Sequence, residues 1–380
     1  MRVLFITNYA ILYGANRSLL SLMEYFHKQG VNVSLLLPKK GDLSHKLLEE
    51  NIPYIRFPYL SSLFIYKKDW TVLQHLEIFM LKVMTLLMFP FILIRVWWYR
   101  PDLIYSNSNA DNLGIFLAKI LRVKHVTHIR DFLDLDHGLY FIGGNVAKRK
   151  FINKSDAVIY VSRTVAEYIQ MSKQLPPNHT VIYNGVKSNS GDYKEKNFPK
   201  HINIGIVGLL VEGKGQHLAI KYLKFILVEY PDTVLHIWGD KEGPYKNKLH
   251  SLVEQLDLSD HVIFHGFEKD TDIIYKEMDV LLMFSRMEGF GRVTVEAMQR
   301  GIPVIGYNSG GTSEIVKNGY NGYLFQSEKE FLAVFKELFS SNDHYKTISH
   351  QAYIDAHKNY SEEMYAKNVF DYINSLRLVK

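Results

Sequence analysis

Residues 284–306, which read FSRMEGFGRVTVEAMQRGIPVIG, hold the most informative pattern in the chain. Glu288 and Glu296 are separated by seven residues, and glycines lie between them where an apolar strand should turn into a helix. Glycine lets the backbone approach a ligand closely, and the first turn of a helix offers unpaired N–H groups with a partial positive charge. The stretch therefore predicts an anion site suited to a diphosphate.

The N–H groups expected to face such an anion are those of Phe290, Gly291 and Arg292. Glu296 comes nearly two turns later, where its carboxylate can accept hydrogen bonds from ribose hydroxyls. Glu288 precedes the helix, where it can bind hydroxyls of a transferred sugar. A pair of glutamates at this spacing would by itself be unremarkable, so the surrounding residues decide the interpretation.

Outward from this stretch, strand-like apolar runs alternate with helical patterns in both halves of the chain. The expected strands are 2–7, 31–37, 103–106, 125–129, 157–161, 180–183, 201–207, 234–238, 262–264, 280–284 and 303–306. Such alternation predicts parallel sheets with right-handed crossovers. The fold class is therefore α/β, with two doubly wound, Rossmann-like domains that face each other across a cleft.

Composition places the domain boundaries and excludes several classes of protein. Segment 187–200, KSNSGDYKEKNFPK, is nearly devoid of apolar residues and is predicted to be a linker between domains 1–186 and 201–359. A helix at about 360–380 is expected to pack back on the first domain. The chain has 380 residues, no cysteine and a net charge of +6, so disulfides are excluded and nucleic-acid binding is not expected.

The first residues, MRVLFIT, lack the pattern of a signal peptide, which favours a cytoplasmic protein. One apolar stretch, 76–98, needs separate treatment. Its uninterrupted part, 83–94, has twelve residues and includes Pro90, whereas spanning a bilayer takes about 20 residues. A helix buried in the first domain is the preferred interpretation. The alternative is a surface helix pair in peripheral contact with the inner face of a membrane through 76–100, where Trp97 and Trp98 adjoin arginines.

Residues 284–306 resemble the E-x7-E signature of the family 4 retaining glycosyltransferases, which have the GT-B fold. The resemblance continues through Gly301 and Pro303, then through 310–314 (GGTSE) and 318–322 (NGYNG). It implies transfer of a sugar, with retention of configuration, from a nucleotide-diphosphate sugar to a glycan or lipid-linked acceptor, as in cell-surface polysaccharide biosynthesis. UDP or GDP is the expected carrier, and no further cofactor is implied. The first domain would bind the acceptor and the second the donor.

Segment 206–216, IVGLLVEGKGQ, resembles the family's glycine-rich loop, in which Gly208 would lie beside the donor and Lys214 would pair with its diphosphate. The family commonly has arginine directly after the first glycine, whereas this chain has Leu209. A second cation at the diphosphate could come from Arg286, from Arg292 or from the first domain's Arg17.

The first domain matches the family more weakly. Residues 13–20, YGANRSLL, resemble its glycine-containing loop near the acceptor, where Gly14 would let the backbone approach the transferred sugar. Residues 127–132, THIRDF, end a predicted strand, and the resemblance gives His128 a catalytic role with Lys214 and Glu288, in contact with the donor sugar or the acceptor.

No metal site is predicted, because Lys214 and a helix N-terminus would supply the positive charge that a divalent cation could otherwise provide. Two alternatives stay open at this point. One is a nucleotide-sugar epimerase, or less plausibly a phosphorylase, on the same fold. The other is a non-catalytic GT-B partner subunit, which the replacement of the usual arginine by Leu209 would favour.

Overall fold

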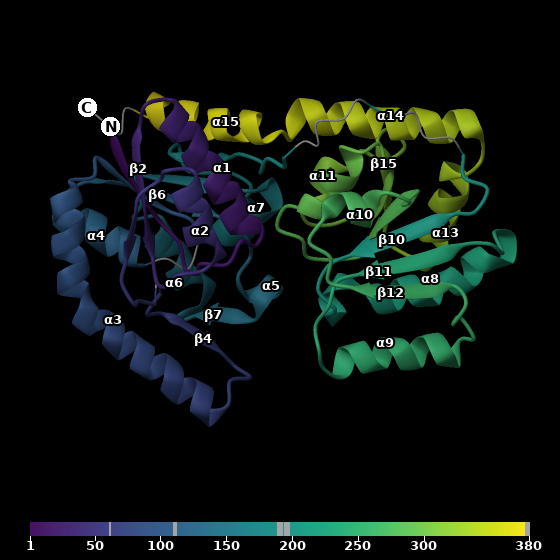
Figure 1. The fold of residues 1–380 in the computed structure, drawn as a ribbon, viewed down its shortest axis with the longest axis horizontal. Coiled ribbons are helices and arrows are strands. Elements are labelled where there is room, and N and C mark those ends of the chain that lie inside the picture. Colours follow the sequence, from purple (N-terminus) through teal and green to yellow (C-terminus); the bar gives the residue numbers. More distant parts are fainter. Residues whose placement is uncertain (61, 109–111, 188–192, 194–197, 377–380) are drawn as a thin grey trace. The chain divides into compact units, whose positions relative to one another are not determined.

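The computed structural model describes residues 1–60, 62–108, 112–187, 193 and 198–376. The chain forms two compact units (Figure 1). Unit 1 comprises Met1–Gly185 together with Glu362–Lys380, and unit 2 comprises Val186–Ser361. Within the expected linker 187–200, positions 188–192 and 194–197 lie outside the described residues.

Unit 1 is built on a seven-stranded sheet with the order β3-β2-β1-β5-β6-β8-β9, in which every pairing is parallel. The strands are β1 (Arg2–Ile6), β2 (Asn32–Leu37), β3 (Tyr54–Arg56), β5 (Leu103–Ser106), β6 (Lys124–Ile129), β8 (Ala157–Tyr160) and β9 (His179–Val181). An antiparallel pair, β4 (Ile65–Lys67) and β7 (Leu139–Phe141), lies outside this sheet. The central strands are almost continuously apolar and buried, as expected for a parallel sheet covered on both faces.

The helices of unit 1 connect these strands, and the chain's last helix joins them. They are α1 (Gly14–Lys28), α2 (Asp42–Glu49), α3 (Val72–Tyr99), α4 (Leu113–Leu121), α5 (Asp134–His137), α6 (Gly144–Ile152), α7 (Arg163–Gln170) and α15 (Glu362–Ser375). Helix α15 packs along α1, where Phe370 meets Phe26 edge to face. Tyr365 and Val369 are buried in the same apolar cluster as β1. The C-terminal helix is therefore part of the core of unit 1.

Unit 2 has a six-stranded parallel sheet with the order β12-β11-β10-β13-β14-β15. Its strands are β10 (Asn203–Val207), β11 (Val234–Trp238), β12 (Val262–Gly266), β13 (Val280–Met283), β14 (Val304–Tyr307) and β15 (Gly322–Phe325). Its helices are the 3-10 turn η1 (Glu212–Lys214), α8 (Gln216–Glu229), α9 (Pro244–Gln255), α10 (Thr271–Tyr275), α11 (Arg292–Met298), α12 (Thr312–Ile315), α13 (Glu328–Leu338) and α14 (Asn342–Asn359). The strand order reverses between β10 and β13, which is where doubly wound sheets bind their ligands.

The preferred interpretation of residues 76–98 as a buried helix is wrong. Helix α3 is one continuous helix of 28 residues that includes Pro90, and only Thr85, Ile92 and Val96 are buried. The length argument failed because it counted the uninterrupted apolar run, whereas the helix begins well before it at a Thr71 N-cap. Among the described residues, α3 is long and apolar enough to cross a membrane, with a mean hydropathy of 2.1 in its most apolar window.

Candidate active site

The glycine-rich loop of unit 2 lies at the switch point of its sheet, directly after β10. Gly208 has a φ of +150° and follows the last residue of that strand. A Cβ on the neighbouring Gly239, after β11, would lie 2.0 Å from the Gly208 carbonyl oxygen. The two strand ends therefore approach so closely that Gly239 tolerates no side chain. A Cβ on Gly208 would lie 3.6–3.8 Å from side-chain carbons of Lys214, so the lysine side chain lies beside the Gly208 backbone.

Lys214 ends the short η1 turn that follows this loop, and its side chain points to the neighbouring strand end. Its Nζ lies 2.7 Å from Oε2 of Glu288, which follows β13. The lysine side chain is 33% exposed and the glutamate side chain 18% exposed, so the pair is open to solvent on one side. The structure thus brings together two side chains that are 74 residues apart in the sequence. Lys214 was predicted to pair with the donor diphosphate, and Glu288 was predicted to bind hydroxyls of the transferred sugar.

The turn from Glu288 to Gly291 is shaped by a second glycine pair. The Gly311 N–H donates a 2.6 Å hydrogen bond to the Glu288 carbonyl. A Cβ on Gly310 would lie 2.8 Å from the Glu288 nitrogen, and one on Gly311 would lie 2.4 Å from the Phe290 oxygen. Both glycines are therefore required for this close packing, which holds the Glu288 backbone in place.

Helix α11 starts at Arg292, after Gly291 in the left-handed conformation at a φ of +98°. It has only seven residues, so its dipole is small, and the cation of Lys214 is the larger source of positive potential here. Phe290 is buried, and its ring packs on Tyr360. The contribution of Phe290 to an anion site would therefore come from its backbone.

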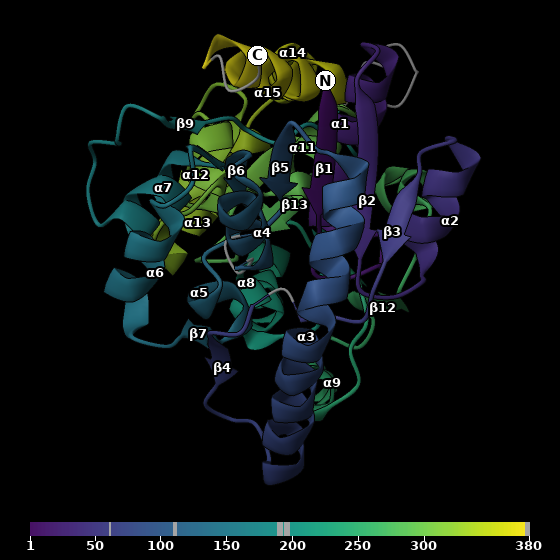
Figure 2. The same cartoon turned by 90° about the vertical axis from the view of Figure 1, so that its left-hand side faces the viewer.

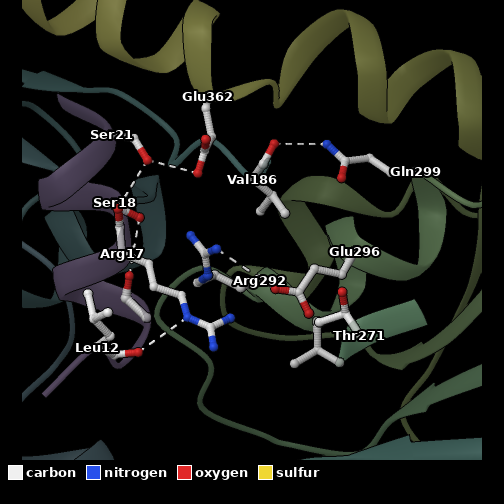
Figure 3. Close-up of polar contacts among 12 residues, drawn as sticks. Leu12, Arg17, Ser18, Ser21, Val186, Thr271, Arg292, Glu296, Gln299 and Glu362 are labelled. Carbon is white, nitrogen blue, oxygen red and sulfur yellow. Dashed lines mark hydrogen bonds and ion pairs between the residues drawn. The ribbon is translucent and has the colours of Figure 1, made fainter. Parts of the chain in front are cut away.

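Glu296 is held by two side chains. Its Oε1 lies 3.8 Å from a guanidinium nitrogen of Arg292, one turn earlier (Figure 3), and its Oε2 accepts a 3.1 Å hydrogen bond from the Tyr275 hydroxyl. Burial raises the pKa of Tyr275 well above its ordinary value, with the Glu296 charge adding to the effect, so this hydroxyl stays a neutral donor. Tyr275 could not be predicted as a partner of Glu296 from the sequence, because it belongs to α10, 21 residues away.

Three further residues bear on which side chain could supply a second positive charge to the donor diphosphate. The Arg286 guanidinium lies 5.0 Å from the centre of the Tyr307 ring, also in unit 2. Leu209 is 57% exposed, so its side chain is only partly covered. In unit 1, Arg17 is exposed and its Nε donates to the Leu12 carbonyl at 3.2 Å (Figure 3).

His128 lies within β6 of unit 1, and its side chain has no exposed surface. Its Nδ1 is hydrogen-bonded to the Tyr105 hydroxyl, whereas its Nε2 is buried without a hydrogen-bond partner in the described part of the chain. Burial, with Arg130 nearby, holds the pKa of His128 well below its ordinary value, so the imidazole is neutral. Gly14, the other site residue predicted in unit 1, is the first residue of α1.

Arg130, two residues after His128, makes more side-chain hydrogen bonds than His128 does, although no role was predicted for it. It is only 7% exposed. Its three nitrogens donate to Asn107 at 2.7 Å, to Asn184 at 2.5 Å and to the Tyr365 hydroxyl at 2.8 Å. Asn184 is the second-last residue of the main part of unit 1, and Tyr365 is in α15, so Arg130 joins both ends of the unit to the end of β6.

The structure also gathers three groups with metal-ligating atoms in unit 1. Asp131, Asp136 and His137 place one such atom each within 4.8 Å of one another. The Asp136 carboxylate accepts the N–H of Phe132, so this group already helps to fold its own loop. Exposed acidic clusters of this kind are common in loops, and this one is no evidence for a bound metal.

Two doubly wound units, each built on a parallel sheet, are the architecture of the GT-B glycosyltransferases. Family models match both halves of the chain: Glycosyltransferase Family 4 over residues 13–189 and Glycosyl transferases group 1 over residues 192–355. The chain therefore belongs to the family 4 glycosyltransferases with the GT-B fold.

Individual relatives agree with this assignment. The chain is 30% identical over 260 residues to the uncharacterized glycosyltransferase MJ1178 of Methanocaldococcus jannaschii, covering 65% of this chain and 68% of that protein. It is 32% identical to spore coat protein SA of Bacillus subtilis, covering 43% and 46%, and 27% identical to the lipopolysaccharide core biosynthesis mannosyltransferase LpsB of Rhizobium meliloti, covering 58% and 65%. The matches to SA and LpsB thus span less than two thirds of those proteins.

Among solved structures, Anabaena Alr3699/HepE in complex with UDP-glucose is similar over 99% of this chain and 100% of that one. The TM-score is 0.78 and the sequence identity 22%, so the likeness concerns the fold.

Proposed function

We propose that this chain transfers a sugar from a nucleoside diphosphate to a glycan or lipid-linked acceptor, with retention of anomeric configuration, in the assembly of a cell-surface polysaccharide. The observation that carries the proposal is the contact between Lys214 and Glu288 at the switch point of unit 2. An ammonium group beside a glycine loop suits a diphosphate, and a carboxylate next to it suits the hydroxyls of the attached sugar.

The roles of the side chains follow from their charges. The bond from the sugar's anomeric carbon to the diphosphate breaks, and negative charge grows on the leaving phosphate oxygen. Lys214 stabilises that charge more in the transition state than in the bound donor, which is the condition for catalysis. The acceptor oxygen bonds to the anomeric carbon on the same face, and its proton passes to the departing phosphate oxygen.

The remaining predicted residues bind and orient. Glu288 would hold sugar hydroxyls, and Glu296 would accept ribose hydroxyls from a position fixed by Arg292 and Tyr275. His128, as placed in this structure, has no exposed surface with which to touch a sugar. Its direct contact with substrate therefore requires a rearrangement of the buried Tyr105–His128 pair, and we assign it a lesser part than Lys214.

Of UDP and GDP, we propose UDP as the nucleotide of the donor sugar. HepE, which shares the fold, has been captured with UDP and with UDP-glucose. The polysaccharide context is taken from relatives such as LpsB, whose name places it in lipopolysaccharide core biosynthesis.

The test is a screen of UDP- and GDP-sugars by thermal shift, followed by turnover with the sugar that stabilises the protein. We expect transfer to need an acceptor, the product to keep the donor's anomeric configuration by NMR, and Lys214→Ala to abolish most of the transfer. Interconversion of the nucleotide sugar with no acceptor present would instead identify an epimerase. We expect the same rate in EDTA as in magnesium, and restoration by magnesium of activity lost in EDTA would show that a metal is needed.

A further inference from the structure

The solvent-facing side of α3 carries an apolar stripe along its whole length. At 100° per residue, the buried side chains Thr85, Ile92 and Val96 lie on one side of the helix. The opposite side is formed by side chains that are 54–68% exposed: Leu76, Met80, Leu87, Ile94 and Trp98. Surface helices of soluble proteins carry polar residues on their solvent-facing side, whereas α3 is apolar on its exposed side as well as on its buried side.

Contacts with unit 1 hold the second half of this helix in place. The Tyr99 hydroxyl donates to the Val3 and Asn32 carbonyls, and the Thr85 hydroxyl accepts the N–H of Leu60 at 2.7 Å. The first residues of α3, 72–77, are all exposed, and this N-terminal end of the helix extends past the other elements of unit 1 in both views (Figures 1 and 2). A helix tied down in this way cannot cross a bilayer, but its outer side can lie on one.

The charges around the stripe are unbalanced. Segment 65–100 contains five cations (Lys67, Lys68, Lys82, Arg95 and Arg100) and two anions (Asp69 and Glu77), a net charge of 5 − 2 = +3. These 36 residues thus carry half of the chain's net charge of +6. Two exposed tryptophans, Trp97 and Trp98, lie near the C-terminal end of the stripe, and such side chains favour the headgroup region of a bilayer.

We infer that α3 is a membrane-docking helix that lies flat on an anionic bilayer, with the stripe among the acyl chains and the flanking cations at the headgroups. Its 28 residues give a docking element about 42 Å long at 1.5 Å per residue. A stripe of this kind binds through buried apolar area combined with attraction to anionic lipids. A second copy of the chain would cover the stripe equally well, but it would add its own net positive charge instead of neutralising it.

The inference is independent of the proposed chemistry, and vesicle flotation of the full chain tests it. The variant Leu76→Ser/Met80→Ser/Leu87→Ser removes three exposed side chains from the stripe. The matched control is Phe225→Ser/Val228→Ser/Ile354→Ser, which removes three exposed apolar side chains from unit 2. We expect the wild type and the control to float with phosphatidylglycerol-containing vesicles, and the stripe variant to bind at least about tenfold more weakly, because each lost apolar side chain removes buried area.

A second measurement uses the two exposed tryptophans near the C-terminal end of the stripe, Trp97 and Trp98. Brominated lipids should quench tryptophan fluorescence of the wild type, and Trp97→Phe/Trp98→Phe should remove most of the quenching. Equal flotation of the stripe variant and the wild type would overturn the inference, as would equal binding to vesicles of phosphatidylcholine alone. A lipid-independent dimer that the stripe variant abolishes would show that a second copy covers α3. An unchanged UDP-induced thermal shift in the stripe variant would separate loss of docking from loss of fold or of the donor site.

Discussion

The Lys214 ammonium and the Glu288 carboxylate lie 2.7 Å apart, beyond the adjacent ends of β10 and β13. Each is a group that the proposed reaction needs for the substrate, and each neutralises the other. A diphosphate arriving at Lys214 therefore competes with a carboxylate of the protein. The contact holds the lysine side chain beside Gly208, and we expect it to weaken ground-state binding of the sugar donor.

This competition predicts the effect of Glu288→Gln. The variant should bind UDP about 1.4- to fivefold more tightly, because partly exposed ion pairs contribute about 0.2–1 kcal/mol and this one would no longer oppose binding. Its turnover should nevertheless fall, since the amide replaces the carboxylate that orients the sugar. Calorimetry with UDP and initial rates measure the two effects. Glu242→Gln, at a Lys246 pair in the same unit, is the control, and tighter binding there too would contradict the explanation.

Leu209 gives a second prediction about the diphosphate. Because its side chain is 57% exposed, Leu209→Arg should fold normally and place a new cation beside the glycine loop. We expect UDP to bind about three- to tenfold more tightly at low salt, with the gain shrinking as salt screens the added charge. Leu209→Gln controls for loss of the leucine. If Leu209→Arg and Leu209→Gln bind UDP equally, the diphosphate does not lie at this loop.

Tyr275 should affect binding of the sugar donor and not the rate of the chemical step. Tyr275→Phe removes one of the two partners of Glu296 and keeps the buried ring. We expect the donor KM to rise about two- to tenfold, in line with a neutral-donor hydrogen bond to a charged group, and kcat to change little. Tyr323→Phe, which removes another buried tyrosine hydroxyl bonded to a glutamate of unit 2, should leave KM unchanged. A fall in kcat alone would place Glu296 in the chemistry instead.

Much of the fold could be predicted from the sequence because apolar strands in parallel sheets are continuous and buried. β10, for example, spans Asn203–Val207 within the expected 201–207. The short edge strands β3 and β15 escaped notice, since runs of three or four residues show no usable periodicity. Helix α3 was misjudged because an exposed apolar helix and a buried one have the same composition.

The residues of the candidate site also fall into two groups: those that a local sequence pattern could predict and those that only the folded structure brings together. The residues on the 284–306 turn could be found because glycine spacing is local. Lys214 could be paired with that turn only through the family resemblance, since the contact joins residues 74 apart. Tyr275 and Arg130 had no local signal at all. Their roles depend on which side chains meet after folding, as in the three hydrogen bonds of Arg130 to Asn107, Asn184 and Tyr365.

The last prediction concerns stability and pH in unit 1. His125 is buried between Ser106 and Ser155, and burial lowers its pKa to about 3, against a smaller opposing effect of Asp156. The unfolded chain takes up a proton on this side chain near its ordinary pKa of about 6.5, whereas the folded chain does not until about pH 3. Its contribution to stability is therefore fully present above about pH 6.5 and is lost progressively as the pH falls toward 3.

A His125→Gln variant has no such proton to take up. Between pH 6.5 and pH 5, the free energy of unfolding of the wild type should fall by about 1.6 kcal/mol more than that of the variant, because the unfolded His125 is half protonated at the higher pH and almost fully protonated at the lower. Urea unfolding followed by circular dichroism at both pH values measures this difference. His45→Gln, at an exposed position, should follow the wild type. Parallel curves for the wild type and His125→Gln would mean that His125 is protonated in the folded protein, and the hydrogen bonds to Ser106 and Ser155 would then have to be reassigned with the imidazolium as donor to both.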